Sequence, residues 1–349
     1  MTKEFSENNG AVIRDIIKAI EKCTRILISA HVRLDGDAIG SEIAVYHALK
    51  NLGKEPDIVN DSSIPRVYAF LPETHFFATS AESLNGDYEL IITLDSPGPN
   101  RLGKVSSILS TGLPIINIDH HVSNSNFGNI NLICPDSSST GEIILNLLKE
   151  TSQKITPEIA TALYVAIVTD TGRFTHSNTT SQSLRAAAYL IDCGANPAEI
   201  TKYLYKTNTH GQMLLHALAT KTMRLDAGGR IATIHLTREM METTKTPAID
   251  TQEFSEIPAS VEGVMVGILL REMKEPNMVK VSLRSRDGID VNKIAQKFGG
   301  GGHEHAAGCE IPGSITDVEK IIVEELKAST GTPAETGVGL LLPKPLSGK

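Results

Sequence analysis

Residues 25–41 read RILISAHVRLDGDAIGS, and this stretch decides the fold of the first half of the chain. Its apolar run, 26–28, is typical of a buried strand, and the residues after Asp37 have the periodicity of a helix. His31, Asp35 and Asp37 stand between the two. Ligands of open α/β sheets bind at the carboxyl ends of strands, so these side chains are candidate ligands. An N-capping aspartate in a solvated loop explains this stretch alone equally well.

The same arrangement of an apolar run followed by acids or histidines returns three times along the chain. The runs are 90–94, which leads to Asp95; 114–118, which leads to Asp119, His120 and His121; and 162–168, which leads to Asp170. We expect the ends of all four runs to meet at one edge of a parallel sheet, where their side chains would converge. The repetition favours one shared site over four unrelated loops.

Apolar strands alternate with helical segments as far as about residue 207, which predicts an α/β domain with a parallel sheet and helices on both faces. We assign 1–207 to this domain, 208–228 to a linker helix, and 229–328 to a smaller α/β domain. The tail, 329–349, is rich in Gly, Pro and Thr and is expected to be disordered.

The composition of the 349 residues is ordinary, with 40% hydrophobic and 21% charged residues and a net charge of −8. The acidic balance and the lack of a dense Lys/Arg run argue against a protein that coats long or duplex nucleic acid. No apolar run is long enough to span a membrane, no signal-peptide pattern opens the sequence, and the four cysteines form no CxxC pair. We therefore expect a cytoplasmic protein with no membrane partner.

Four aspartates that meet at one sheet edge would repel one another without compensating charge. Two divalent cations would balance them, and two neutral imidazoles would complete the coordination. The expected ligands are His31, Asp35, Asp37, Asp95, His120 and Asp170. This mixed oxygen and nitrogen set suits Mn²⁺, with Mg²⁺ or Co²⁺ as substitutes, and two such ions can clamp both oxygens of a phosphoryl transfer. The alternative for any one aspartate is a helix cap or an ion pair.

Residues 298–308, FGGGGHEHAAG, form a second candidate site. Four consecutive glycines expose backbone N–H groups that can hold an anion, although the run matches neither a P-loop nor a dinucleotide fingerprint. Lys280, Ser282, Arg284 and Arg286 alternate along an expected strand and so share one face. Together these features indicate a phosphate clamp, because Arg binds phosphate through two hydrogen bonds. A flexible turn and a solvated strand edge are the alternatives.

Five motifs, taken in order, resemble those of the DHH phosphoesterase superfamily and its DHH-associated C-terminal domain. They are HVRLDGDAIGS (31–41), LDSPGPNRLG (94–103), IDHHVSN (118–124), TDTGRF (169–174) and GGGGHEHAAG (299–308). The resemblance covers most of residues 15–328, and the ordered combination is highly specific. The compact chain is similar to members that degrade short oligoribonucleotides and 3′-phosphoadenosine-5′-phosphate (pAp).

The resemblance also implies a role for each motif residue. One metal would lie on His31, Asp35 and Asp95, and a second on Asp37, Asp95, His120 and Asp170, with Asp95 bridging. Asp119 would support the histidine pair, His121 would act on the scissile phosphate, and Arg101 and Thr171 would lie near the metals as a catalytic residue and a substrate contact. Arg284, Gly301, Gly302 and His303 would hold the rest of the substrate, together with Arg286 from the strand row.

The expected function is therefore a Mn²⁺-dependent phosphoesterase that hydrolyses short oligoribonucleotides to mononucleotides and removes the 3′-phosphate of pAp. A phosphodiesterase for cyclic-di-AMP or pApA would use the same motifs, whereas a family II pyrophosphatase would lack the glycine turn. The non-enzymatic alternative, a nucleotide-binding regulatory module, predicts a missing ligand, and every ligand position is occupied. The expected partners are short RNA and small phosphorylated nucleotides, and a homodimer is left open.

Overall fold

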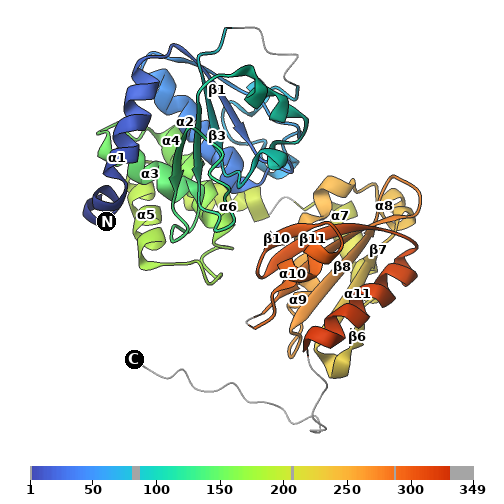
Figure 1. Cartoon of the computed structure of the whole chain (residues 1–349). Coiled ribbons are helices and arrows are strands. Elements are labelled where there is room, and N and C mark those ends of the chain that lie inside the picture. Colours follow the sequence, from blue (N-terminus) through green and yellow to red (C-terminus); the bar gives the residue numbers. More distant parts are fainter. Residues whose placement is uncertain (1, 81–86, 206–207, 287, 331–349) are drawn as a thin grey trace. The chain divides into compact units, whose positions relative to one another are not determined.

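The computed structural model describes residues 2–80, 87–205, 208–286 and 288–330. Its helices and strands fall into two compact units, residues 1–207 and 208–349 (Figure 1). The tail expected to be disordered lies outside the described residues from 331 onward, and its first two residues belong to the last helix, α11 (Ile315–Thr330). None of the helices in the described part combines the length and the apolar character that a membrane crossing needs.

A five-stranded parallel sheet forms the centre of the first unit. Its strands are β1 (Arg25–Ala30), β2 (Glu55–Ile58), β3 (Leu90–Leu94), β4 (Ile115–Asp119) and β5 (Ile130–Ile133), in the order β2-β1-β3-β4-β5. β3 and β4 are buried along their whole length, which is why their sequences are nearly continuous apolar runs. The predicted parallel sheet is confirmed. The sequence patterns do not indicate β5, because its four residues, INLI, are too short a run.

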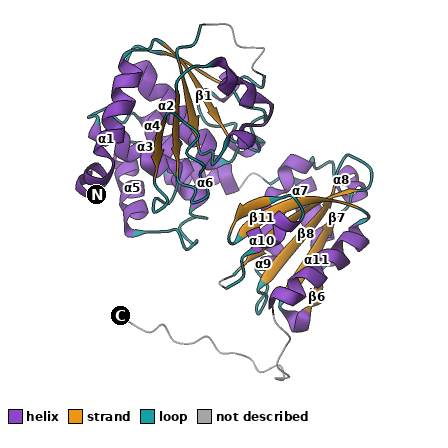
Figure 2. Cartoon of the chain, viewed as in Figure 1, coloured by secondary structure: helices purple, strands orange, loops and turns teal. Residues whose placement is uncertain are grey.

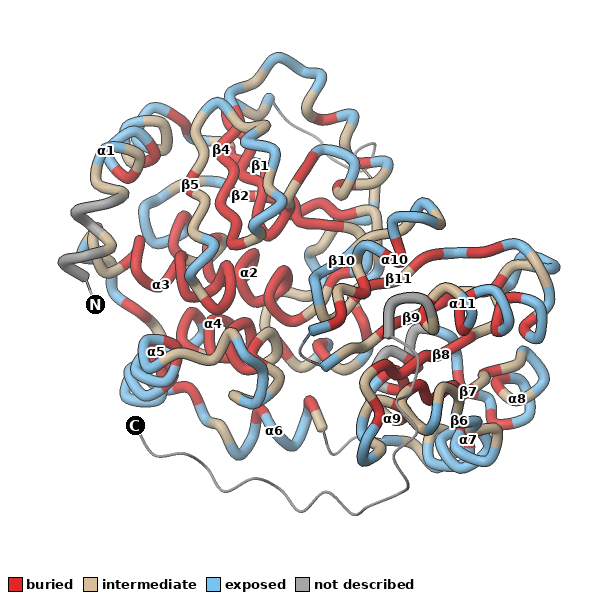
Figure 3. Tube along the Cα trace, turned by 60° about the horizontal axis from the view of Figure 1, so that its bottom comes forward, coloured by how far each residue is buried: buried red, intermediate tan, exposed pale blue. Residues whose placement is uncertain are grey.

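Both faces of this sheet are covered. On one face α2 (Gly36–Asn51), α3 (Thr140–Glu150) and α4 (Pro157–Asp170) pack together, flanked by α1 (Thr2–Glu21), α5 (Ser181–Asp192) and α6 (Pro197–Tyr205) (Figure 2). On the other face, Val105 and Ile108 of the 3-10 segment η4 (Pro99–Thr111) share a core with Leu27 and Ile91. The short 3-10 helices η1 (Arg66–Tyr68) and η2 (Thr74–Phe76) follow β2. Figure 3 shows the buried positions concentrated in the strands and in α2 to α4.

The fourth apolar run lies in a helix, α4. The buried side chains of α4 lie all around its axis, because the helix packs against α2, α3 and α5 at once. An apolar helix of this kind is typical of the middle of a helical layer. The helix begins at Pro157, a residue that favours the first turn of a helix, and Asp170, its last residue, reaches the sheet edge from the helical layer.

Gly40 allows α2 and α4 to approach closely. A β-carbon here would collide with the backbone oxygen of Ala162 and would lie 3.1 Å from the Ala166 methyl carbon. We expect Gly40→Ala to lower the free energy of unfolding, measured in urea, by about 1–3 kcal/mol. Gly10→Ala is the matched control, because a β-carbon at this position in α1 meets the end of the Arg14 side chain at 3.4 Å. The control should stabilise the protein by about 0.5–1 kcal/mol. Equal effects at both glycines would contradict the packing argument.

A six-stranded mixed sheet forms the second unit. Its strands are β6 (Arg224–Asp226), β7 (Ile231–Leu236), β8 (Val266–Glu272), β9 (Met278–Ser285), β10 (Gly301–His303) and β11 (Ala306–Pro312), in the order β10-β11-β9-β8-β7-β6. β7 and β8 are parallel, and the other described pairs are antiparallel. The remaining helical segments are α7 (His210–Lys221), α8 (Arg238–Thr243), α9 (Glu256–Ala259), α10 (Val291–Lys297), η5 (Ala227–Gly229) and η6 (Ala248–Ser255).

Helix α7 covers most of the segment that the sequence suggested as a linker. Its Leu215 and Ala219 are fully buried in one hydrophobic cluster with Ile234 and Leu236 of β7. The helical segment expected after the first domain is thus present in the structure, and it contributes to the core of the second unit.

Candidate metal centre

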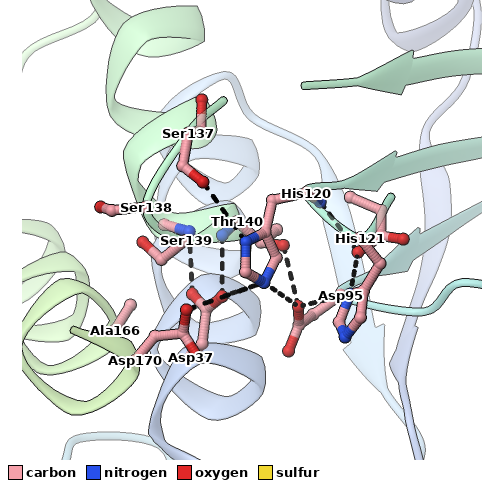
Figure 4. Close-up of polar contacts among 12 residues, drawn as sticks. Asp37, Asp95, His120, His121, Ser137, Ser138, Ser139, Thr140, Ala166 and Asp170 are labelled. Carbon is pink, nitrogen blue, oxygen red and sulfur yellow. Dashed lines mark hydrogen bonds and ion pairs between the residues drawn. The ribbon is translucent and has the colours of Figure 1, made fainter. Parts of the chain in front are cut away.

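Three overlapping groups of acids and histidines lie at the carboxyl edge of the first sheet. Figure 4 shows Asp37, Asp95, His120 and Asp170 converging from different elements. The groups are His31, Asp35 and Asp95; Asp37, His120 and Asp170; and Asp95, His120 and His121. Within each group, one ligand atom per residue lies within 4.8 Å of the others. The structure therefore brings together all six residues that the sequence suggested as metal ligands.

Asp95 occupies the centre of the cluster. It follows the middle strand, β3, and its φ of +51° lies in the left-handed region that Asp and Asn tolerate better than most residues. Its Oδ2 lies 3.1 Å from His31 Nε2. Its Oδ1 accepts a hydrogen bond of 3.0 Å from the Thr140 hydroxyl and lies 3.6 Å from His120 Nε2. This buried carboxylate therefore faces ligand atoms on both sides.

Asp35 and His31 form the first group with Asp95. The His31 Nδ1–H donates to the backbone oxygen of Val32 at 2.9 Å, so its Nε2 is the nitrogen that faces the acids. Asp35 is the N-cap of α2, where its Oδ1 accepts from the backbone N–H groups of Asp37 and Ala38, both at 3.0 Å. Its Oδ2 lies 3.5 Å from His31 Nε2. The helix-cap alternative is thus correct for Asp35, and it leaves the second oxygen directed at the cluster.

The N-terminus of α3 holds the carboxylate of Asp37. The backbone N–H groups of Thr140 and Gly141 donate to its two oxygens at 2.7 and 2.9 Å. A helix N-terminus favours a negative charge, which explains how a carboxylate that is 1% exposed is accommodated here. The sequence patterns miss both residues, because a backbone N–H group leaves no signature in the side chains.

His120 links Asp37 to Asp170. Its Nε2 lies 3.8 Å from an oxygen of each aspartate, and its Nδ1 donates to the backbone oxygen of Ser137 at 3.4 Å. Asn178 donates to Asp170 Oδ2 at 3.2 Å. His31 and His120 are therefore each oriented by a backbone carbonyl behind the ring, as is typical of metal-binding histidines.

The charges of the cluster are not balanced by its own histidines. Burial tends to lower the pKa of His31, but the carboxylates of Asp35 and Asp95 outweigh it and hold that pKa well above its ordinary value. Burial opposes ionisation of Asp95, yet the hydrogen bond with His31 and the nearby imidazoles hold its pKa well below the usual range. The pKa values of Asp37 and Asp170 are raised, because both are buried near Asp95. Divalent cations would supply the missing positive charge.

Asp119 holds the neighbouring histidine in position. Its Oδ1 accepts from His121 Nδ1 at 2.7 Å and from the His120 backbone N–H at 2.9 Å. Its Oδ2 accepts from Asn124 Nδ2 at 2.6 Å, and Asn124 also donates to Asn117 Oδ1 at 2.8 Å. The supporting role implied by the motif therefore has a geometric basis, and Asn124 is a further supporting residue that the sequence patterns did not single out.

Arg101 and Thr171, the two other motif residues, differ in whether their side chains already have hydrogen-bond partners. The Arg101 backbone oxygen accepts from the N–H of Val32, beside His31, and its side-chain Nε is buried with no hydrogen-bond partner among the described residues. Thr171 is fully buried, and its hydroxyl donates to the backbone oxygen of Ile167 at 2.6 Å at the end of α4. In this structure the hydroxyl is engaged at the end of the helix, and the expected contact of Thr171 with substrate stays a prediction.

The cation row of the second unit is confirmed in part. Lys280, Ser282 and Arg284 share the more exposed face of β9, while Arg286 lies beyond the strand and donates to the backbone oxygen of Ala259. Arg284 Nε donates to Glu256 Oε1 at 2.6 Å, so a phosphate would have to share this guanidinium.

The glycine turn approaches the cation row across the sheet. His303 of β10 pairs with Ala306 of β11, which in turn pairs with Arg284 of β9. Gly300 and Gly302 also have a packing role, since a β-carbon at either would collide with the backbone of β11. Gly301, the remaining glycine of β10, pairs with Gly308. The glycines therefore let the edge strand β10 pair closely with β11, and this pairing places His303 in register with Arg284 of β9.

Comparison with known proteins agrees with this arrangement. The family model described as "DHH family, N-terminal domain" matches residues 25–167, and the DHHA1 domain model matches residues 242–329. The bifunctional oligoribonuclease and PAP phosphatase NrnA of Thermus thermophilus is 36% identical over 311 residues, 88% of this chain and 89% of that protein. The protein of the same name from Bacillus subtilis is 27% identical over 302 residues, 85% and 92% of the two chains.

The fold is also similar to a solved structure. The crystal structure of an exopolyphosphatase-related protein from Bacteroides fragilis has a TM-score of 0.85 at 27% sequence identity, and the match covers 91% of this chain and 97% of that one. The sequence match to the Thermus protein and the two domain matches, together with the cluster around Asp95, lead to one conclusion: this chain belongs to the DHH phosphoesterase family and carries a DHHA1 domain as its second part.

Proposed function

We propose that this protein is a phosphoesterase with two Mn²⁺ ions per chain that hydrolyses short oligoribonucleotides to mononucleotides and removes the 3′-phosphate of pAp. The observation that carries the proposal is one buried cluster in which two acid–histidine groups meet at Asp95. The names of the Thermus and Bacillus relatives, which state both activities, support the choice of substrate.

The donor set fits divalent cations, because buried carboxylates and imidazole nitrogens approach one another without enough positive charge of their own. One ion would be held by His31, Asp35 and Asp95, and the other by Asp37, Asp95, His120 and Asp170. When bound, such ions neutralise the carboxylates and lower the pKa of a water molecule that can attack phosphorus.

The residues around the cluster have separate tasks in this proposal. Asp119 fixes Nδ1 of His121, so that Nε2 is the ring nitrogen that exchanges a proton with the reacting phosphate. Thr140 keeps Asp95 in its orientation through the hydroxyl hydrogen bond. The buried Nε of Arg101 is a donor for a phosphate oxygen. Arg284 and the glycine turn would bind a second phosphate or the nucleotide.

The proposal predicts a preference for short substrates. The net charge is −8 and the sequence has no dense basic run, so nucleotides beyond those held at the site gain little binding. With two or three phosphates held, log kcat/KM should fall against log salt with a slope of about −1.4 to −2.1, at roughly 0.7 per phosphate. Initial rates for a series from dinucleotides to a long single strand, at two salt concentrations, measure this. Rates that rise with length, or a steeper slope, would indicate an extended binding groove instead.

A substrate panel with Mn²⁺ separates the alternatives. The proposal expects pAp and short RNA to be turned over faster than cyclic-di-AMP and pyrophosphate. Hydrolysis of cyclic-di-AMP that is faster than hydrolysis of pAp and short RNA would favour a cyclic-dinucleotide phosphodiesterase. Binding of these nucleotides without any turnover would favour the regulatory module.

A further inference from the structure

A cavity of about 380 Å³ lies in the second unit, between α8, the segment that follows it, and the end of β8. It contains none of the residues of the glycine turn or of the cation row on β9. β9 pairs Lys280 with Arg271, which lines the cavity, and Arg284 with Gly267, four residues earlier on β8. At roughly 3.3 Å per residue, the cavity and Arg284 are separated by about 13 Å along the sheet.

The lining of the cavity is cationic although the chain is acidic. Its charged residues are four cations, Arg238, Lys245, Arg271 and Lys274, and two carboxylates, Glu242 and Glu272. Glu272 is already engaged, since it accepts from the Arg238 backbone N–H at 2.8 Å and lies 3.9 Å from Arg238 Nε. Lys245 and Lys274 are exposed, and no carboxylate in the described part of the chain forms an ion pair with either. These two lysines therefore give the cavity two ammonium groups that form no ion pair among the described residues.

The rest of the lining is apolar. Met241, which is 9% exposed, lies there with Pro247 and Ala248. An inorganic anion would use the cations and leave this apolar surface in water, whereas a nucleotide would cover it with its base and place its phosphate on the lysines. A volume of about 380 Å³ is also in the usual range for small-molecule sites, which begins near 300 Å³.

We propose that this cavity is a second nucleotide-binding site, which takes a mononucleotide or the terminal nucleotide of an RNA, with the phosphate on Lys245 and Lys274 and the base against Met241 and Pro247. The residues that line it include none of the catalytic cluster and none of the glycine turn. The proposal does not require the proposed enzymatic function, because it concerns binding and is tested without turnover.

The test is a calorimetric titration of the full chain with AMP in the presence of a chelator. We expect Lys245→Ala/Lys274→Ala to remove one class of sites or to weaken it at least tenfold, with the glycine-turn site retained. Lys221→Ala/Lys320→Ala removes two equally exposed lysines from α7 and α11 and is the control for net charge. Arg284→Ala should weaken AMP binding at the glycine-turn site and leave binding in the cavity unchanged. Unchanged AMP binding in the cavity variant, or equal loss in the control, would overturn the proposal.

A local measurement keeps the test independent of stoichiometry. With ¹³C-methyl-labelled methionine, the Met241 resonance, assigned with Met241→Leu, should shift on addition of AMP in wild type and in Arg284→Ala but not in the cavity variant. Adenosine and inorganic phosphate should each give a weaker response than AMP, and a 5′-phosphorylated dinucleotide distinguishes an RNA end from a mononucleotide by its relative affinity. A Met241 resonance that AMP leaves unchanged, or that adenosine shifts equally, would contradict a nucleotide phosphate in this cavity.

Discussion

Asp95→Asn should reduce the kcat/KM for short oligoribonucleotides by about a thousandfold or more, because several kcal/mol of transition-state stabilisation depend on the bound cations. The substitution removes the charge that faces both His31 and His120 while it keeps an oxygen for the Thr140 hydroxyl. Asparagine also tolerates the left-handed backbone at φ +51°, so the variant should fold. Elemental analysis should find less than two Mn²⁺ per chain.

Asp57→Asn is the matched control for this substitution. Asp57 lies on β2, half exposed, where it accepts from the Tyr88 hydroxyl at 2.8 Å and has no part in the cluster. The Asp57→Asn variant should stay folded, since surface substitutions change stability little. Its activity and metal content should therefore stay within a factor of about two of wild type. If Asp95→Asn retained two ions and full activity, the assignment of Asp95 as the shared ligand would be wrong.

Mn²⁺ should also raise the melting temperature of the chelator-treated protein by about 8–16 °C. This range counts only one of the two ions: at a thousand times its dissociation constant, one ion bound by the native state alone adds about 4.1 kcal/mol, and each kcal/mol shifts Tm by about 2–4 °C in a domain of this size. The physical reason is the mutual repulsion of four clustered aspartates, two of them, Asp37 and Asp95, fully buried, which the ions relieve.

The thermal shift has an internal control for ionic strength. Sodium chloride at the same ionic strength should change Tm little, because the cluster is buried and exposed charges contribute weakly. Asp95→Asn should show a reduced shift with Mn²⁺. Equal shifts with Mn²⁺ in wild type and in the variant would mean that the stabilising ions bind elsewhere.

The sequence was sufficient to predict the parallel sheet and the six clustered residues. Both follow from short apolar runs, such as 90–94 and 114–118, that end directly in acids or histidines. A buried strand has few alternatives when its residues are continuous Ile and Leu, and the carboxyl ends of parallel strands lie at one edge. The sequence therefore predicts that His31, Asp95 and His120 lie at the carboxyl edge of the sheet.

The parts that the sequence could not predict depend on tertiary packing. Asp170 reaches the sheet edge from the helical layer because α4 packs against α2, α3 and α5, and an apolar run does not show which elements a helix packs against. Thr140 and Gly141 act through backbone N–H groups, which any residue would supply. The internal hydrogen bond of the Thr171 hydroxyl to the backbone oxygen of Ile167 also depends on the fold, and its motif position gives no sign of it.

All six clustered residues lie in the first compact unit, which the ribosome completes before it makes the second. The last of the six clustered residues is Asp170, and residues 208–349 form the other unit. At about 5–20 residues per second, the ribosome needs roughly 7–28 seconds to add those 142 residues after the first unit is complete. The nascent chain can therefore fold its ligand set and select a cation before its second unit exists. The metal that a newly made molecule carries would then reflect the ions available around the ribosome during that interval.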